Sequence, residues 1–269
     1  MQLKPTKIEW CTHSWNPVTG CLHGCDYCYA RRITQRFGPH GADRIGNAEK
    51  IETQDTSLGK LYTLKEAAVI RDASGEERKS HWPYGFAPTF HPYSLDLPKK
   101  SVKPSRIFVS SMGDLFGSWV PDDWIFAVFD ACLAAPQHTY LFLTKNPARY
   151  LKLAKEDRLP RGDGFWYGSS ATNTEMPAFF SEEHHTFASI EPILEPFRGE
   201  DVQRATRRQD WIILGAETGS RKEKVKPEKD WFADIVDAGV PVFMKDSLKP
   251  IWGEELVRQY PASMPNTEA

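Results

Sequence analysis

Three of the five cysteines in this chain lie within eight residues, and they are the side chains best suited to chemistry. Cys21, Cys25 and Cys28 follow the spacing C-x3-C-x2-C, and an aromatic residue, Tyr27, precedes the last of them. Thiolates are soft ligands that select zinc, copper(I) or iron–sulfur clusters. A cubane cluster has more irons than these three thiolates can ligate, so one iron would stay open to a substrate or cosubstrate.

A structural zinc site is the alternative interpretation of the same loop. Three cysteines and one further ligand close a zinc site, and His13, His23 or Cys11 would supply that ligand. Structural zinc sites usually combine two separated cysteine pairs, whereas this chain has one compact triplet and no second pair. The spacing therefore favours an iron–sulfur cluster. Cys132 lies in an apolar helical pattern and is expected to be a buried small hydrophobe.

The elements that must position these cysteines show a regular pattern from Arg106 onward. Buried-type strands alternate with helices there, which predicts right-handed βαβ units and a parallel sheet. A short strand at Ile8–Trp10, leading toward the cysteines, brings the total to about seven. The other expected strands are Ile107–Ser110, Tyr140–Leu143, Phe165–Ser170, Thr186–Ile190, Trp211–Leu214 and Val240–Met244. The expected helices are Pro121–Ala134, Pro147–Ala154 and Trp231–Ala238.

The segment that follows the cysteines has a different pattern. Tyr29–Phe37 is expected to be a helix ended by Gly38 and Pro39. Residues 38–100 do not read as regular α/β structure, and Leu61–Ile70 is expected to form one helix within them. We interpret residues 38–100 as an insertion that forms a lid or a substrate wall. A satellite hydrophobic cluster packed on the core is the alternative.

Polar residues follow nearly every expected strand at its carboxyl end. In βα barrels, chemistry gathers at that end of the strands. Lys145 and Lys245 are suited to neutralise a carboxylate or a phosphate, and ion pairing with Glu191 or Glu217 is the alternative. The full set of strand-end residues is Asp114, Lys145, Asn173, Glu191, Glu217 and Lys245.

The pattern C-x3-C-x-aromatic-C, carried by Cys21, Cys25, Tyr27 and Cys28, resembles the hallmark of the radical S-adenosylmethionine (SAM) superfamily. The resemblance implies a [4Fe–4S] cluster on the three cysteines, with the fourth iron chelated by the amine and carboxylate of SAM. One electron would cleave the sulfonium C–S bond, and the resulting 5′-deoxyadenosyl radical would take a hydrogen atom from a substrate. An electron donor such as a flavodoxin or a ferredoxin is implied as a partner.

The same resemblance implies the domain organisation. The expected fold is α/β, a partial (β/α)6-7 barrel of the radical SAM type with an irregular insertion. Its core would comprise residues 1–37 and 101–252, with residues 38–100 inserted and residues 253–269 as a C-terminal tail.

Individual site residues are also implied by the resemblance. In the superfamily, a glycine-containing segment after the second strand contacts the SAM amine, and Gly113 and Asp114 occupy that place, although the segment departs from the common Gly-Gly-Glu form. Groups after the fourth and fifth strands commonly hold the ribose and carboxylate of SAM, and these are Thr172, Asn173, Ser189 and Glu191. The residues expected to act on substrate are Lys145, Glu217 and Lys245, with Glu217 as a hydrogen-bond acceptor.

Longer segments resemble an uncharacterised family found in phages and mobile elements. The matching segments are Ile8–Trp10, Trp15–Cys21, Ser111–Phe116, Leu143–Pro147, Ser189–Pro192, Gly215–Gly219 and Phe243–Asp246. This resemblance brings no established substrate. It favours a nucleotide or nucleic acid, as do the basic segments Lys145–Arg161 and Arg204–Arg208 and the aromatic residues at 81–93, which are suited to stack bases.

Two other functions stay open. The same radical chemistry could act on a peptide or protein partner, or the chain could be a zinc-stabilised binding module without catalysis. Composition does not decide between them, because the net charge of −2 gives no strong field for nucleic acid or anionic membrane.

Compartment and membrane contact are predicted from composition. The cysteines are odd in number and mostly clustered, so they do not form a disulfide framework. There is no run of about 18 apolar residues and no apolar core of a signal peptide near the N-terminus. A cytoplasmic protein without a membrane partner is therefore expected.

Overall fold

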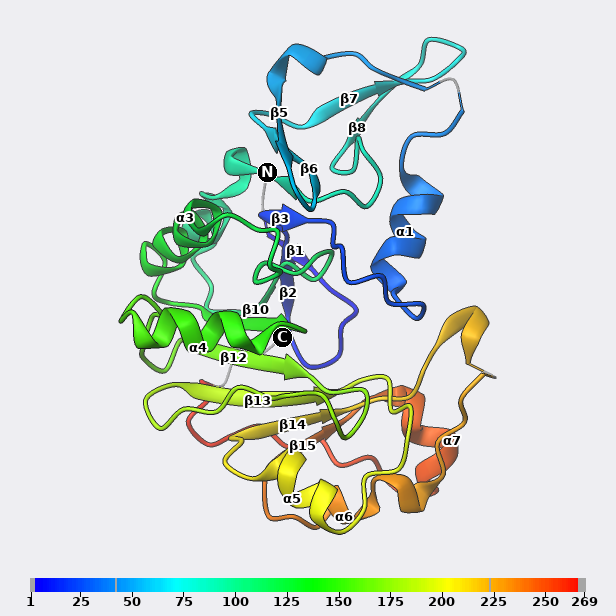
Figure 1. The fold of residues 1–269 in the computed structure, drawn as a ribbon, viewed down its shortest axis with the longest axis vertical. Coiled ribbons are helices and arrows are strands. Elements are labelled where there is room, and N and C mark those ends of the chain that lie inside the picture. Colours follow the sequence, from blue (N-terminus) through cyan, green and yellow to red (C-terminus); the bar gives the residue numbers. More distant parts are fainter. Residues whose placement is uncertain (1–2, 42, 223, 266–269) are drawn as a thin grey trace. The chain divides into compact units, whose positions relative to one another are not determined.

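The computed structural model describes residues 3–41, 43–222 and 224–265, and the chain folds into two compact units (Figure 1). Unit 1 comprises Met1–Pro5, His13–Pro104 and Phe108–His138, and unit 2 comprises Thr6–Thr12, Ser105–Ile107 and Thr139–Ala269. The chain therefore passes from one unit to the other within β10 (Arg106–Val109). In the described ranges, no helix has the length and apolar character needed to cross a membrane.

The described part of unit 2 is built on five parallel strands, which run from green to orange in Figure 1. Each strand pairs in parallel with the next, as Tyr140 beside Phe165 and Ile212 beside Val242 illustrate. Nearly every strand residue is buried, which is typical of parallel strands covered on both faces. In spatial order the strands are β11 (Thr139–Thr144), β12 (Phe165–Ser170), β13 (His185–Ile190), β14 (Trp211–Leu214) and β15 (Val242–Met244).

Short helices connect these strands. Ile190 and Ile212 of the sheet share one apolar core with Phe232, Ile235 and the neighbouring helices α5 and α6 (Figure 1). The alternation of strand and helix confirms an α/β fold with a mostly parallel sheet. The strand order is linear and no pairing among the described strands closes it, so the partial barrel remains a prediction. The helices are α4 (Pro147–Lys155), α5 (Glu200–Thr206), α6 (Ala233–Val236) and α7 (Lys249–Trp252).

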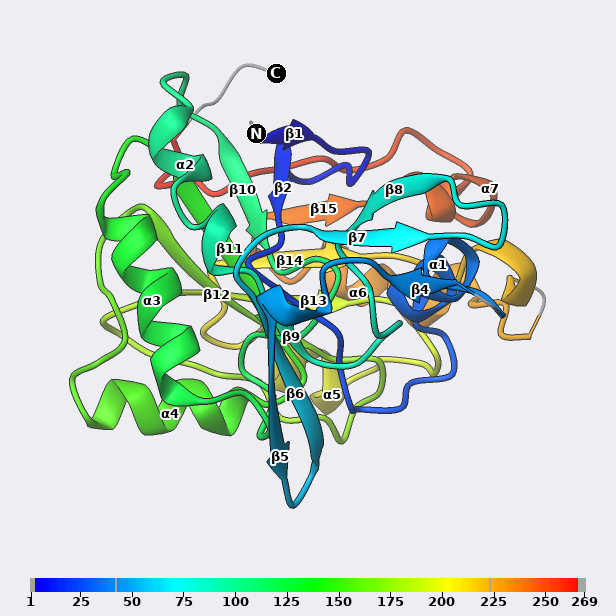
Figure 2. The same cartoon turned by 90° about the horizontal axis from the view of Figure 1, so that it is seen from above.

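The described part of unit 1 combines three α-helices with small sheets, and Figure 2 shows β5 (Ile51–Thr56) and β6 (Gly59–Leu64) as a long hairpin. The helices are α1 (Tyr29–Phe37), α2 (Leu97–Lys100) and α3 (Asp122–Leu133). One sheet has the order β3 (Val18–Thr19), β9 (Thr89–Phe90), β6 (Gly59–Leu64) and β5 (Ile51–Thr56). Another consists of β4 (Arg44–Ile45), β7 (Ala68–Arg71) and β8 (Glu77–Ser80), and β1 (Lys4–Pro5) pairs with β2 (His13–Trp15).

Three predictions for this part of the chain are wrong. Leu61–Ile70 is not one helix, because it contributes to the strands β6 and β7. Residues 38–100 are not irregular, since they supply most strands of two small sheets. Ile8–Trp10 is not a strand either, because the Cys11 N–H donates to the Ile8 carbonyl (3.3 Å) and closes a turn. The strand before the cysteines is β2 instead.

The helix after the cysteines is confirmed at both ends. Cys28 is the N-cap of α1, where its Sγ accepts a hydrogen bond from the Arg31 N–H (3.4 Å). At the other end the Gly38 N–H donates to the Thr34 carbonyl (2.8 Å). The first turn of α1 therefore fixes the backbone of the last cysteine.

Candidate functional site

The cysteine loop, residues 21–28 of unit 1, carries three reduced thiols that are all partly exposed. The Sγ of Cys21 accepts a hydrogen bond from the His23 N–H (3.5 Å), and the Cys28 N–H donates to the Cys25 carbonyl (3.2 Å). These local hydrogen bonds curl the loop back on itself just before α1. The three thiols therefore lie on one short segment that ends at the first turn of α1.

The acidic groups around Cys21 influence its ionisation. The pKa of the Cys21 thiol is raised to about 12, mainly by burial. The hydrogen bond from the His23 N–H lowers this pKa, whereas the charges of Asp114, Cys25 and Cys28 raise it. Four acidic groups thus lie close enough to interact electrostatically, and a cation bound among them would favour the thiolate.

Among the described residues, no three histidine, cysteine or acidic side chains are arranged as metal ligands. The residue types nevertheless fit an iron–sulfur cluster, because thiolates are its usual protein ligands. The assignment of Cys21, Cys25 and Cys28 as ligands therefore stays a prediction that the donor chemistry supports.

Asp114 binds the cysteine loop directly. Its Oδ2 lies 2.7 Å from Nε2 of His23, and its Oδ1 accepts a hydrogen bond from the Phe116 N–H (3.0 Å). Asp114 is only 4% exposed, and the His23 ring stands edge-on to Trp119 with ring centres 4.8 Å apart. Sequence reasoning assigned Asp114 to the SAM ammonium and considered His23 only as a zinc ligand, so this pair was missed.

The backbone beside Asp114 is held against the strand that leads into the cysteine loop. Asn16 Oδ1 accepts hydrogen bonds from the Met112 N–H (2.9 Å) and the Ser111 hydroxyl (3.1 Å). The Gly20 N–H donates to the Met112 carbonyl (2.9 Å), and a Cβ on Gly113 would lie 2.8 Å from the Gly20 carbonyl oxygen. Close approach of two backbones thus explains the glycine at position 113.

A buried chain of hydrogen bonds fixes the start of the same loop. Nε2 of His91 lies 2.9 Å from the Thr19 hydroxyl, and its Nδ1 lies 3.3 Å from the Tyr93 hydroxyl. That hydroxyl also lies 3.0 Å from Nδ1 of His81. Burial lowers the pKa of His91 to about 3, so this imidazole is neutral at physiological pH. Part of the predicted lid, residues 38–100, therefore anchors the cysteine loop.

In unit 2, Glu191 and Lys245 form an ion pair across the carboxyl ends of β13 and β15. Both side chains are partly exposed, at 27% and 19%. Gly215, at the end of β14, lies between them, because a Cβ there would be 3.2 Å from both side chains. The ion-pairing alternative considered for Lys245 is thus the arrangement observed.

Glu217 follows the same strand and is 7% exposed. Its Oε1 accepts a hydrogen bond from Nε of Arg221 (2.5 Å), whereas its buried Oε2 has no hydrogen-bond partner in the described part of the chain. A buried acceptor without a partner is costly, so such an atom marks a position where a ligand hydroxyl or amine would be favoured.

The other predicted residues of unit 2 have local roles. The N–H and hydroxyl of Thr172 both lie 3.3 Å from the Met176 sulfur. Asn173 Oδ1 accepts hydrogen bonds from the Glu175 and Met176 N–H groups (3.2 and 3.1 Å), which makes an Asx turn. Ser189 is buried within β13. Lys145 is partly exposed between β11 and α4.

The predicted residues therefore fall into two groups. Unit 1 brings the three cysteines together with Gly113 and Asp114. Unit 2 brings Glu191 together with Lys245 around Gly215, and Glu217 follows on the same strand end. The pairings of Glu217 with Arg221 and of Asp114 with His23 were not predicted, because no local sequence pattern marks them.

The chain was compared with known proteins. A family model described as "Protein of unknown function (DUF5131)" matches residues 5–256. This match spans most of the 269 residues, so the chain belongs to the DUF5131 family. No curated protein and no solved structure matches the chain. The family description gives neither an activity nor a cofactor, so function is argued from the residues themselves.

Proposed function

We propose that this member of the DUF5131 family is a radical SAM enzyme that binds a [4Fe–4S] cluster through Cys21, Cys25 and Cys28. The observation that carries the proposal is the cysteine loop itself, with three reduced, partly exposed thiols on one segment beside a helix N-terminus. Four acidic groups interact there, which suits a bound cationic metal centre. When bound, the cluster would supply the electron that cleaves SAM.

The chain's own residues would position this chemistry. In unit 1, Asp114 holds His23 and therefore the middle of the cysteine loop, while Asn16 holds the backbone of residues 111 and 112. The predicted role of Asp114 toward the SAM ammonium then competes with its pairing to His23. We propose that Asp114 acts first as a loop anchor, because its side chain is buried and already paired.

The strand-end residues of unit 2 keep their predicted roles in the proposal. The free Oε2 of Glu217 suits a hydroxyl or amine donor, and the predicted roles of Thr172, Asn173 and Ser189 toward SAM remain part of the proposal. Lys145 and Lys245 are proposed to face an anionic part of SAM or substrate. For Lys245 this requires exchange of its pairing with Glu191, which is feasible because both side chains reach solvent.

The proposed substrate class is a nucleotide or nucleic acid, and the enzyme would act in the cytoplasm with a flavodoxin or ferredoxin as electron donor. The test is release of 5′-deoxyadenosine from SAM by anaerobically reconstituted protein with dithionite, measured by liquid chromatography and mass spectrometry. Release that depends on the cysteine loop and is stimulated by nucleotides, DNA or RNA supports the proposal. Protein that retains one zinc, without iron or acid-labile sulfide, would identify a zinc-stabilised module instead.

A further inference from the structure

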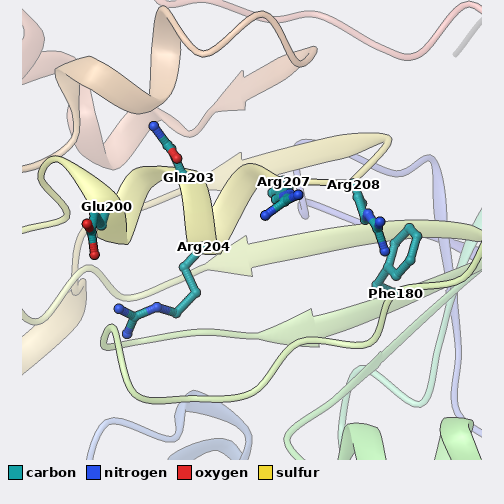
Figure 3. Close-up of a pocket in the computed structure, with 6 residues that line it drawn as sticks. All are labelled: Phe180, Glu200, Gln203, Arg204, Arg207 and Arg208. Carbon is teal, nitrogen blue, oxygen red and sulfur yellow. The ribbon is translucent and has the colours of Figure 1, made fainter.

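A basic hollow lies on unit 2, at α5 and the turn that follows it (Figure 3). Its volume is about 530 Å³, and Figure 3 shows Arg207 between Arg204 and Arg208, with Phe180 beside Arg208. The lining residues are Phe180, Glu200, Gln203, Arg204, Arg207 and Arg208. Three guanidinium groups and a single carboxylate therefore line one hollow, which favours an anionic ligand.

Arg207 and Arg208 differ from other arginines of unit 2 in their ion pairing. Within the described part of the chain, neither residue forms an ion pair. Arg204 has a weak one, with 3.5 Å between its guanidinium and Asp201. Arg161 and Arg198 of the same unit differ, because Arg161 pairs with Glu183 (2.7 Å) and Arg198 pairs with Asp230.

The backbone also distinguishes this hollow. Arg208 has φ 65°, a left-handed conformation that glycine adopts most easily at the end of a helix. An arginine in this conformation lowers stability. The Arg208 side chain extends over the Phe180 ring, with its guanidinium carbon 4.5 Å from the ring centre. The neighbouring Phe179 is tied to Gln209 by a hydrogen bond (3.0 Å), which fixes the aromatic loop against the arginine turn.

Under the proposed function, one ligand would reach from this hollow to the strand ends, and this distance sets its size. Arg207 and Arg208 precede β14, whereas Glu217 follows its carboxyl end. Four strand residues separate these ends by about 13 Å, so a mononucleotide bound at one end would not reach the other. An extended polyanion with one phosphate per residue would span this distance.

We propose that Arg204, Arg207, Arg208 and Phe180 form a binding site for single-stranded nucleic acid. The guanidinium groups contact successive phosphates, and an unpaired base stacks on the paired planes of Arg208 and Phe180. A second hollow, which shares Phe180 and Arg208, is lined by several acids and does not suit phosphate. The polymer therefore lies over α5 and not in that neighbouring hollow.

The experiment is fluorescence anisotropy with a labelled single-stranded oligonucleotide of about 20 nucleotides. The test variant is Arg207→Ala/Arg208→Gly, since glycine suits the left-handed backbone and keeps the fold stable. The matched control is Arg161→Ala/Arg198→Ala, which removes the same net charge from ion-paired positions. We expect at least tenfold weaker binding by the test variant and less than a twofold change in the control.

Two further measurements sharpen the test. Loss of two phosphate contacts lowers the slope of log K against log salt by about 1.4, and Phe180→Ala weakens binding roughly tenfold. Equal losses in the two double variants, equal affinity for duplex, or effective competition by a mononucleotide would each overturn the proposal. Binding is measured without iron, SAM or reductant, so its failure leaves the proposed radical chemistry standing, and the converse also holds.

Discussion

The cysteine loop of unit 1 and the strand ends of unit 2 differ in the partners of their ionisable groups. At the strand ends, Glu191 pairs with Lys245, and Glu217 pairs with Arg221. In the loop the groups that act electrostatically on Cys21 are Asp114, Cys25 and Cys28, and its thiol accepts a backbone hydrogen bond from His23. The carboxylates at the strand ends are thus paired with cationic side chains, whereas the Cys21 thiol is influenced mainly by acidic groups. Under the proposed function, the loop would therefore depend on a bound cation more than the strand ends do.

The largest expected effect concerns the loop. Cys25→Ala should abolish retention of the cluster, because two thiolates do not hold a cubane stably. Iron and sulfide analysis after anaerobic reconstitution measures this. Cys132→Ala is the matched control, since Cys132 is fully buried in α3 and should not affect metal content. Full iron content in Cys25→Ala would show that Cys25 is not a cluster ligand and would contradict the difference between the loop and the strand ends.

His91, in the hydrogen-bond chain before the cysteine loop, should make the free energy of unfolding depend on pH. The pKa of His91 is about 3 in the folded protein and about 6.5 when unfolded, so the unfolded chain binds more protons between these values. The free energy of unfolding should therefore fall as pH is lowered through this window, by up to about 1.4 kcal/mol per pH unit from this residue. Urea unfolding from pH 7 to 5 should show a shallower slope for His91→Gln. Parallel slopes would exclude His91 as the cause.

Glu217→Gln tests whether Oε2 of Glu217, at the strand ends, accepts a hydrogen bond from a ligand. The unfolding free energy should change by less than about 2 kcal/mol, because Oε2 makes no hydrogen bond within the described protein and a glutamine oxygen can still accept the Arg221 hydrogen bond. The Kd for SAM or substrate should nevertheless rise about tenfold, as a charged acceptor is lost. Isothermal titration calorimetry measures the Kd. A large loss of stability with unchanged affinity would make Glu217 purely structural.

Asp114→Asn distinguishes an anchor from a SAM ligand. If Asp114 acts through His23, then His23→Gln should weaken SAM binding to a similar degree, by several-fold, with the cluster retained. If Asp114 binds the ammonium itself, only Asp114→Asn should do so. SAM affinity of the reconstituted variants decides between these outcomes, and an unchanged Kd in both would exclude either role.

The smallest effect is expected for Glu191 and Lys245. Both reach solvent, so a double-mutant cycle with Glu191→Gln and Lys245→Met should give a coupling of about 1 kcal/mol or less. Chemical denaturation of the four proteins measures it. A coupling of several kcal/mol would show that this pair is a fixed structural element, unable to release Lys245 toward a ligand.

Much of the fold could be predicted because its signals are local. The buried runs of β11 to β14 and the helix Tyr29–Phe37 follow directly from apolar pattern and from Gly38. The strands β6 and β7 could not be predicted in this way. Buried Leu61, Leu64 and Ala68 are spaced three and four residues apart, as on one face of a helix.

The residues of the candidate site could be predicted, but the side chains that pair with them could not. Strand ends marked Glu191, Glu217 and Lys245, since parallel strands place such residues at one edge of a sheet. The pairing of Asp114 with His23 depends on contact between residues 91 positions apart, for which the sequence carries no local signal. Long-range partners of this kind arise from tertiary packing alone.

The measurement that tests the central claim most directly is the metal content of the whole chain purified and reconstituted without oxygen. About four irons and four sulfides per chain are expected, with a broad visible absorbance that changes when SAM is added. One zinc per chain with no iron or sulfide, bound by the same three cysteines, would contradict it.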